Sequence, residues 1–153
     1  MRHLMFILPI ATLAILSGCA STDDVPPNGT QFTLDGCPPF MNCVSTSADK
    51  QRHAIEPIRL VEPLNESSWE MIRAEALKLP GASLNHVRYG YADITCYSDI
   101  VGFPDYLEIL IDPDQQKLNV RSQSLLGFYD MGVNRQRVEL LRSRLVERGI
   151  AVE

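Results

Sequence analysis

Residues 117–148 change within a few positions from the alternation of a β-strand to the spacing of an α-helix. Residues 117–125 place Leu118 and Val120 on one face, which is typical of a half-buried strand. The side chains that follow at helical steps of three and four, all but one of them apolar, are Met131, Asn134, Val138, Leu141 and Leu145. Gly149 is a typical stop signal behind such a helix. Because each element has one apolar face, we expect the helix to pack on a sheet.

Earlier segments supply the rest of that sheet and a second helix. Residues 55–62 are expected to form an edge strand, because prolines bound them. A helix is expected from Ser67, which has capping-box spacing to Glu70, to residue 79. Residues 84–97 are expected to form one long strand with a bulge near Gly90, and residues 106–111 another. The order β-α-β-β-β-α predicts an α+β fold, a mainly antiparallel sheet with two packed helices.

Size and composition restrict the class of protein. The chain has 153 residues, enough for one domain, and its 45% hydrophobic and 22% charged content is that of an ordinary globular protein. Its formal net charge is −5, which argues against a nucleic-acid partner bound through bulk positive charge. We therefore expect no nucleic-acid partner.

The first residues resemble the signal of a bacterial lipoprotein. A basic start is followed by an apolar run over residues 4–16, which is too short to span a bilayer as a helix. The run ends in Leu16-Ser17-Gly18-Cys19, which resembles a lipobox. The alternative is an ordinary cleavage site beside a chance cysteine. We expect residues 1–18 to be a signal peptide, Cys19 to be lipidated, residues 19–35 to form a tether, and residues 36–153 to form one α+β domain.

The resemblance to lipoproteins also implies a location. Several acyl chains on one residue anchor a protein stably, so the expected partner is a membrane, reached through the lipid anchor. Ala20 follows the cysteine where an aspartate would retain a lipoprotein in the inner membrane of enterobacteria. We expect a protein of the cell envelope, attached to the outer membrane and facing the periplasm.

Two further cysteines lie close together in a proline-rich segment. Cys37 and Cys43 are expected to form a disulfide, since an oxidising envelope favours one. Unpaired structural thiols and a catalytic or metal-binding role are the alternatives. No CxxC or HxxxH spacing occurs, so we expect no metal and no cofactor. Cys96 is expected to be a buried small hydrophobe.

Polar side chains gather where the last strand meets the last helix. The candidates for a polar cluster or a ligand site are Arg121, Ser122, Ser124, Asp130, Asn134 and Arg135. Two interpretations remain open: a network that locks the strand to the helix, or a site for a small anionic ligand at the helix N-terminus. The arginines at 137, 142, 144 and 148 are interpreted mostly as a solvated face.

No established enzyme motif appears in the sequence, which lacks GxSxG, HExxH and a glycine-rich phosphate loop. The leading hypothesis is therefore a non-catalytic binding or scaffolding domain on a lipid anchor, with an unknown protein or a small anionic ligand as its partner. The alternative is a hydrolase-like envelope enzyme with a site around Arg121, Ser124, Asp130 and His53.

One long motif resembles a known family. The pattern RSxSxxGxxDxGxNxxR over residues 121–137 resembles the domain-of-unknown-function family numbered 1499. Weaker matches to the same family are Cys37-Pro38, Asn42-Cys43-Val44-Ser45, His53-x-Ile55-x-Pro57 and Phe103-x-Asp105-x-x-Glu108. One departure is Phe40-Met41, directly before Asn42, where members of that family usually have Ser-Pro. The resemblance implies a small bacterial envelope or organelle-associated domain and brings no established activity.

Overall fold

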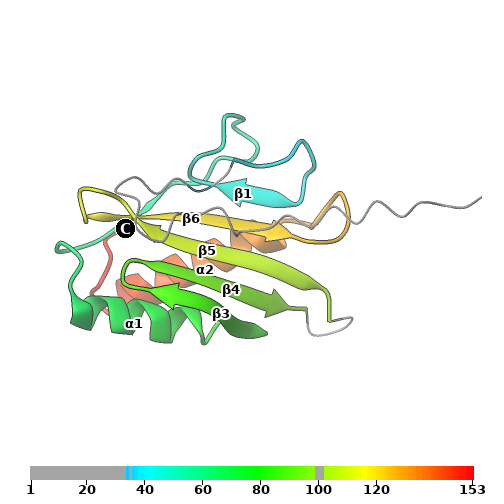
Figure 1. Ribbon diagram of the computed structural model, residues 1–153. Coiled ribbons are helices and arrows are strands. Elements are labelled where there is room, and N and C mark those ends of the chain that lie inside the picture. The colour runs from blue at the N-terminus through cyan, green and yellow to red at the C-terminus, as the bar shows by residue number, and fades with distance from the viewer. Residues whose placement is uncertain (1–33, 35, 99–101) are drawn as a thin grey trace, which may run out of the picture.

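The computed structural model describes residues 34, 36–98 and 102–153, which form one antiparallel sheet with two helices. The elements are β1 (Cys43–Ser45), β2 (Ile58–Arg59), α1 (Glu66–Ala76), β3 (Ala82–Arg88), β4 (Tyr91–Tyr97), β5 (Pro104–Ile111), β6 (Lys117–Ser124) and α2 (Val133–Glu147). The strands lie in the order β1-β6-β5-β4-β3, and β2 also pairs with β6 (Figure 1). Every pairing is antiparallel, so the predicted α+β class is confirmed.

The order of elements differs from the prediction in two places. Residues 84–97 do not form one bulged strand, because the chain reverses at Tyr89-Gly90 to make the β3–β4 hairpin. Gly90 has a φ of +76°, and a Cβ there would come within 2.5 Å of the Ile111 side chain. Strand β1 was not expected, and the strand expected over residues 55–62 shortens to β2. The observed order is therefore β-β-α-β-β-β-β-α.

Both helices begin at other residues than expected. Asn65, not Ser67, caps α1, and its side chain accepts from the Ser68 backbone N–H. Helix α2 begins at Val133, because Met131 and Gly132 have φ values of 54° and 81°, in the left-handed region. Met131 is consequently exposed and does not join the buried face of α2.

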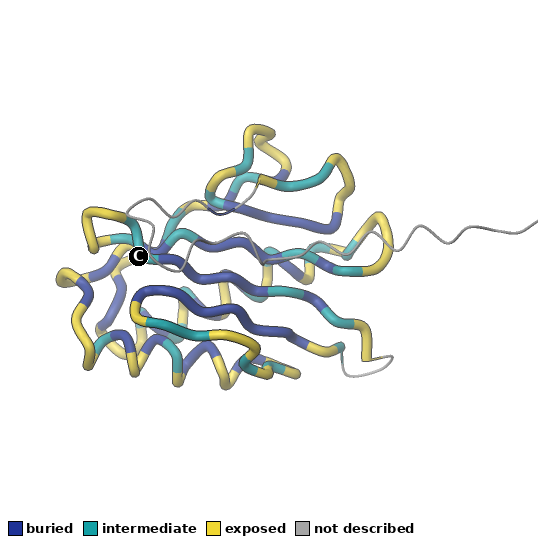
Figure 2. The backbone as a smooth tube through the Cα atoms, viewed as in Figure 1, coloured by how far each residue is buried: buried dark blue, intermediate teal, exposed yellow. Residues whose placement is uncertain are grey.

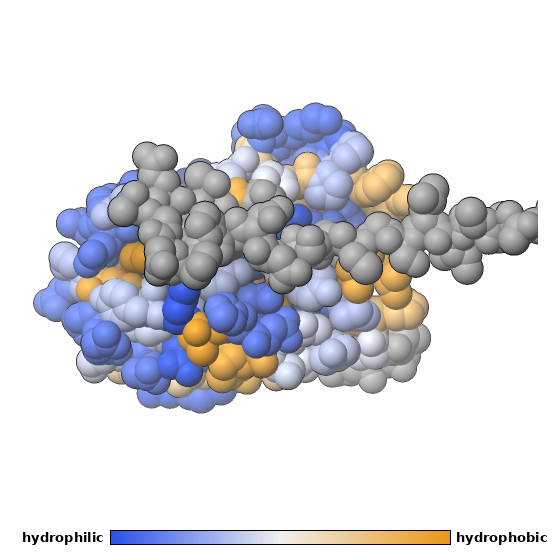
Figure 3. All heavy atoms as spheres, viewed as in Figure 1, coloured by the Kyte–Doolittle hydropathy of each residue, from blue (hydrophilic) through white to orange (hydrophobic). Residues whose placement is uncertain are grey.

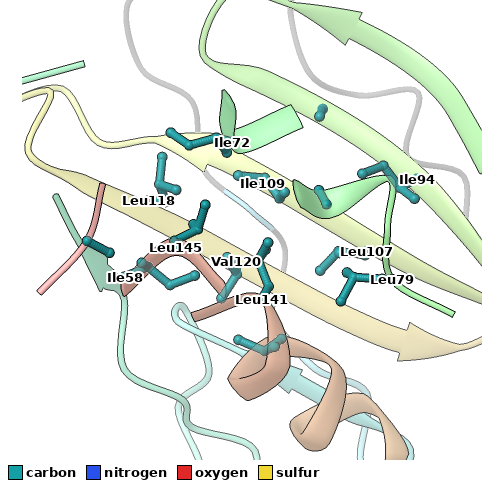
Figure 4. Close-up of a cluster of buried hydrophobic side chains, with 14 of the residues drawn as sticks. Ile58, Ile72, Leu79, Ile94, Leu107, Ile109, Leu118, Val120, Leu141 and Leu145 are labelled. Carbon is teal, nitrogen blue, oxygen red and sulfur yellow. The ribbon is translucent and has the colours of Figure 1, made fainter. Parts of the chain in front are cut away.

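The main core lies between one face of the sheet and the two helices (Figure 4). Leu118 and Val120 of β6 are fully buried there, as the alternation predicted. The buried residues of α2 are Asn134, Val138, Leu141 and Leu145, which confirms that this helical face is inward. The central strands are buried along most of their length, while the loops at both ends of the sheet are exposed (Figure 2). Cys96 is a buried free thiol, as expected.

The other face of the sheet carries a smaller cluster and a row of charges. Leu34 packs there with Tyr91 and Leu110. Asp93, Glu108 and Arg121 are cross-strand neighbours on β4, β5 and β6. Among the residues that the structure describes, no helix is long and apolar enough to cross a membrane.

Candidate binding surface and its polar support

A buried polar cluster joins β6 to the start of α2, with the Asn134 side chain at its centre. The Asn134 Nδ2 group donates to Ser124 Oγ at 2.8 Å and to Asp130 Oδ2 at 2.7 Å. The Ser122 hydroxyl donates to Asn134 Oδ1 at 2.7 Å. Asn134 is fully buried, so these bonds replace the water that its amide loses on folding. The structure thus brings together Ser122, Ser124, Asp130 and Asn134.

Asp130 serves both the cluster and the helix. Its Oδ1 accepts from the Gly132 N–H at 2.8 Å, and its Oδ2 accepts from the Asn134 N–H at 3.2 Å. These are N–H groups of the kind that a helix leaves unpaired at its start. The carboxylate is therefore engaged in holding the loop before α2.

A buried ion pair extends the cluster toward β5. Arg137 Nη2 lies 2.6 Å from Asp105 Oδ2, and each side chain is 9% exposed. Arg137 Nη1 donates to Asn134 Oδ1 and to Ser122 Oγ. The interpretation of Arg137 as part of a solvated face is therefore wrong. Its guanidinium is buried and connects Asp105 to the cluster around Asn134.

Arg121 lies outside the cluster, because neighbouring residues of a strand point to opposite faces of the sheet. Its Nη1 pairs with Glu108 Oε2 at 3.2 Å on the face away from the helices, and Nη2 donates to Gln123. Burial raises the pKa of Glu108, while the nearby Arg121 opposes that rise. A combined site of Arg121 with the buried serines is not what the structure forms.

Arg135 and His53 lie on the side of α2 that faces the β1 segment. Arg135 Nη2 donates to the carbonyl oxygens of Ala54 and Arg52. The His53 ring accepts from Arg52 Nε at 3.0 Å, and its Nδ1 lies 3.0 Å from the Cys43 carbonyl oxygen. Because an arginine Nε can only donate, His53 Nε2 must be the accepting nitrogen of the ring. The ring proton is therefore on Nδ1, which donates to the Cys43 carbonyl oxygen. Of the residues in the hydrolase alternative, Ser124 and Asp130 are both bonded to Asn134. Arg121 and His53 bond to other partners, away from that cluster.

Two loops beside the cluster are bonded to each other. The expected disulfide between Cys37 and Cys43 is confirmed and closes the first loop. The Met41 N–H donates to the Phe128 carbonyl at 2.9 Å, and the Asp130 N–H donates to the Met41 carbonyl at 3.1 Å. The Phe40 and Phe128 rings meet edge-on at 4.8 Å between centroids.

Asn42 fastens this pair of loops to the strand beneath. Its side-chain Nδ2 donates to the Gly127 carbonyl at 2.7 Å. Its backbone carbonyl oxygen accepts from the Ser124 N–H and from Asn134 Nδ2. Residues 37–43 and 125–132 therefore form one braced unit, with the polar cluster as its base.

The braced loops present large apolar side chains to solvent. We call them the double-loop surface: Phe40, Met41, Leu126, Phe128, Tyr129 and Met131. Their exposed fractions run from 44% for Phe40 to 78% for Met131. Hydrophobic residues are visible at the end of the sheet where β6 ends (Figure 3). Single exposed hydrophobes are common on protein surfaces, whereas exposed apolar groups that lie together need an explanation.

A hollow of about 230 Å³ adjoins the double-loop surface. Met41, Tyr129 and Met131 line its apolar side, and Arg52 and Arg135 line the other. The ion pairs found within residues 36–98 and 102–153 involve neither of these arginines. The arrangement therefore offers apolar contacts beside two cationic groups.

A second hollow of about 300 Å³ opens between the first half of α2 and the end of β4. Tyr97, Val133 and Leu140 line it, with the Asp105–Arg137 pair at its polar side. Within the described part of the chain, no three His, Cys, Asp or Glu side chains are placed to hold a metal ion. Asp105 and Arg137 are bonded to each other and to the cluster around Asn134, which favours a supporting role for this pair.

Most of the chain matches one known protein family. A profile described as "Protein of unknown function (DUF1499)" matches residues 33–145. The chain belongs to the DUF1499 family. In this DUF1499 protein, the matched span contains both braced loops and the cluster around Asn134. No curated protein and no solved structure gave a match.

The DUF1499 motif residues prove to be the bracing of the double loop. Those with a place in it are Asn42, Asp105, Ser122, Ser124, Gly127, Asp130, Asn134 and Arg137. The exposed residues that this bracing carries, such as Phe128 and Tyr129, were not predicted from the sequence. A signal existed, because residues 126–131 place four bulky apolar side chains in a loop with few polar ones.

Proposed function

We propose that this DUF1499 protein is a lipid-anchored protein of the bacterial cell envelope whose domain is a non-catalytic binding module. We further propose that the double-loop surface is where the domain binds. The anchor is Cys19, which lies with the signal and most of the tether outside the described residues. The expected site of attachment is the outer membrane, on its periplasmic side.

One observation carries the proposal: large apolar side chains stay exposed on loops that are held in place by a disulfide, a ring contact and hydrogen bonds. Exposing Phe128 and Tyr129 forgoes the favourable burial of apolar surface. A loop that served only to connect β6 to α2 would not need these side chains. Rigid presentation of apolar side chains lowers the entropy cost of binding, which is what a recognition surface requires.

The bonding of the polar residues supports binding over hydrolysis. The Ser124 hydroxyl accepts from the Asn134 amide, and His53 bonds to Arg52 and the Cys43 carbonyl. A serine nucleophile needs a base within hydrogen-bonding reach, and the histidine of the hydrolase alternative, His53, is bonded to other partners. The geometry therefore favours a module that presents a surface.

Two experiments test the proposal. Mass spectrometry of the N-terminal peptide from membranes should show cleavage before Cys19 and acyl chains on that residue; an unmodified Cys19 would contradict the anchor. Crosslinking in native membranes should then capture partners, lipid or protein, that are lost in Phe128→Ser/Tyr129→Ser. The control Val61→Ser/Met71→Ser removes two other exposed apolar side chains and should keep the partners. Equal loss from both variants, or from neither, would reject the double-loop surface as the binding site.

A further inference from the structure

We propose that the double-loop surface docks on the anionic surface of a phospholipid bilayer, with its apolar side chains in the interface and Arg52 and Arg135 against lipid phosphates. This inference rests on the proposed function, which makes that surface the binding surface, and it names the partner.

The apolar side chains have the exposure that insertion requires. Phe128 is 71% exposed, Tyr129 68% and Met131 78%, and all three lie on the one short loop between β6 and α2. They project from a braced loop, so the backbone beneath them keeps its hydrogen bonds when the tips leave water. Aromatic and aliphatic side chains flanked by basic residues are the composition of interfacial membrane contacts.

The arginines are fixed next to these side chains. Arg135 is held by the Ala54 carbonyl at 2.8 Å, and Arg52 by the Pro39 carbonyl at 3.0 Å. Both acceptors are neutral, so neither bond neutralises the guanidinium. Asp130 contributes the negative charge in the same hollow, but its carboxylate is bonded to the Gly132 and Asn134 N–H groups. Two positive charges beside apolar tips complement a layer of phosphates above acyl chains.

The length of chain before the domain permits this contact. Seventeen residues separate Cys19 from Cys37, and the disulfide joins Cys37 to Cys43, two positions after Met41. A chain spans at most about 3.5 Å per residue, so this segment reaches roughly 60 Å at most. A lipid on Cys19 would therefore keep the surface within reach of the bilayer, and stable membrane attachment commonly combines two such signals.

The test places a tryptophan at the proposed point of insertion. The full chain carrying Phe128→Trp is reconstituted with vesicles of equal parts phosphatidylglycerol and phosphatidylcholine, with or without bromine on the acyl chains. The matched control is Met71→Trp, because Met71 is an exposed apolar residue of α1; the native Trp69 is buried and gives the same background in both. We expect a blue-shifted emission that brominated lipid quenches for Phe128→Trp, and neither effect for Met71→Trp. Emission at position 128 that is the same with and without bromine would overturn the proposal.

The charges are tested in the same vesicles. Arg52→Gln/Arg135→Gln in the Phe128→Trp chain should lose most of the quenching, and Arg52→Lys/Arg135→Lys should retain it because the charge is kept. Vesicles of phosphatidylcholine alone should also quench less. Equal quenching in all of these would refute the role of the arginines. If position 128 stays in water while Phe128→Ser/Tyr129→Ser still loses a crosslinked protein, the partner is a protein, so membrane docking fails and the proposed function stands.

Discussion

The side-chain amide of Asn134 donates to the hydroxyl of Ser124 at 2.8 Å, joining the second residue of α2 to the last residue of β6. The same amide reaches Asp130 in the loop between the two elements and the Asn42 carbonyl in the disulfide loop. One buried side chain therefore fixes the strand, the helix and both braced loops relative to one another.

Asn134→Ala is expected to destabilise the domain by about 1–3 kcal/mol, because it leaves buried partners such as Ser122 without their bonds. In a domain of this size the melting temperature should fall by several degrees. Ser143→Ala is the control, since Ser143 is exposed on the same helix, and it should cost roughly 0.5 kcal/mol or less. Equal melting temperatures for the two variants would show that Asn134 does not brace the structure.

The Asp105–Arg137 pair predicts an asymmetric response to mutation. Asp105→Asn leaves the guanidinium buried without its counter-charge and should cost roughly 3 kcal/mol. Replacing both residues, as Asp105→Leu/Arg137→Met, should recover much of that loss, because both charges of the pair are then gone. Urea denaturation of the wild type and the two variants checks this order. A double variant less stable than Asp105→Asn would argue against it.

Removing the disulfide should lower stability and loosen the first loop. Closing a loop with a sequence separation of 6 contributes about 2 kcal/mol in the chain-entropy model. Cys37→Ala/Cys43→Ala should therefore melt at a lower temperature than the wild type, and its melting should not respond to reductant. Cys96→Ala should keep the wild-type response to reductant, since Cys96 is a free thiol. A wild-type melting temperature indifferent to reductant would contradict this role for the bond.

Glu108 gives the domain a specific pH dependence. Burial raises the pKa of Glu108 above its ordinary value of 4.5, so just above pH 4.5 the folded chain keeps a proton that the unfolded chain has released. Raising the pH through that interval therefore lowers the free energy of unfolding. Measured against Glu108→Gln, wild-type stability should decline as the pH rises from 4.5 toward neutrality. Arg121→Gln should make the decline larger, because it removes the cation that lowers the pKa of Glu108. A difference that stays flat or grows with pH would refute this.

Local patterns were enough to predict the elements that carry the cluster. Asn134 stands on an apolar helical seam, and Ser122 and Ser124 share the phase of Leu118 and Val120, so their burial followed from spacing. The disulfide was also predictable, since its cysteines are close in the sequence. The same alternation should have separated Arg121 from the serines, because it places residue 121 on the other face.

Long-range contacts account for what the sequence did not predict. In the sequence, Arg137 is one of several arginines that fit an exposed helix face. Its burial depends on Asp105, which is 32 positions away in the chain and pairs with it in the fold. The turn between β3 and β4 is Tyr89-Gly90, which lacks the Asn-Gly or Asp-Gly pair that most strongly predicts a two-residue hairpin turn. Because strand-forming residues flank it on both sides, the sequence predicted one continuous strand. The double-loop surface needs Met41 and Tyr129 to pair across the fold, which no local pattern specifies.

Site-specific photo-crosslinking in native membranes tests most directly whether the double-loop surface is the contact surface. A photoreactive residue replaces Phe128 in one chain and Met71 in another, and the adducts are identified by mass spectrometry. The structure predicts discrete lipid or protein adducts from position 128 and none of these from position 71. Adducts from position 71 alone, or the same background from both positions, would contradict the central claim.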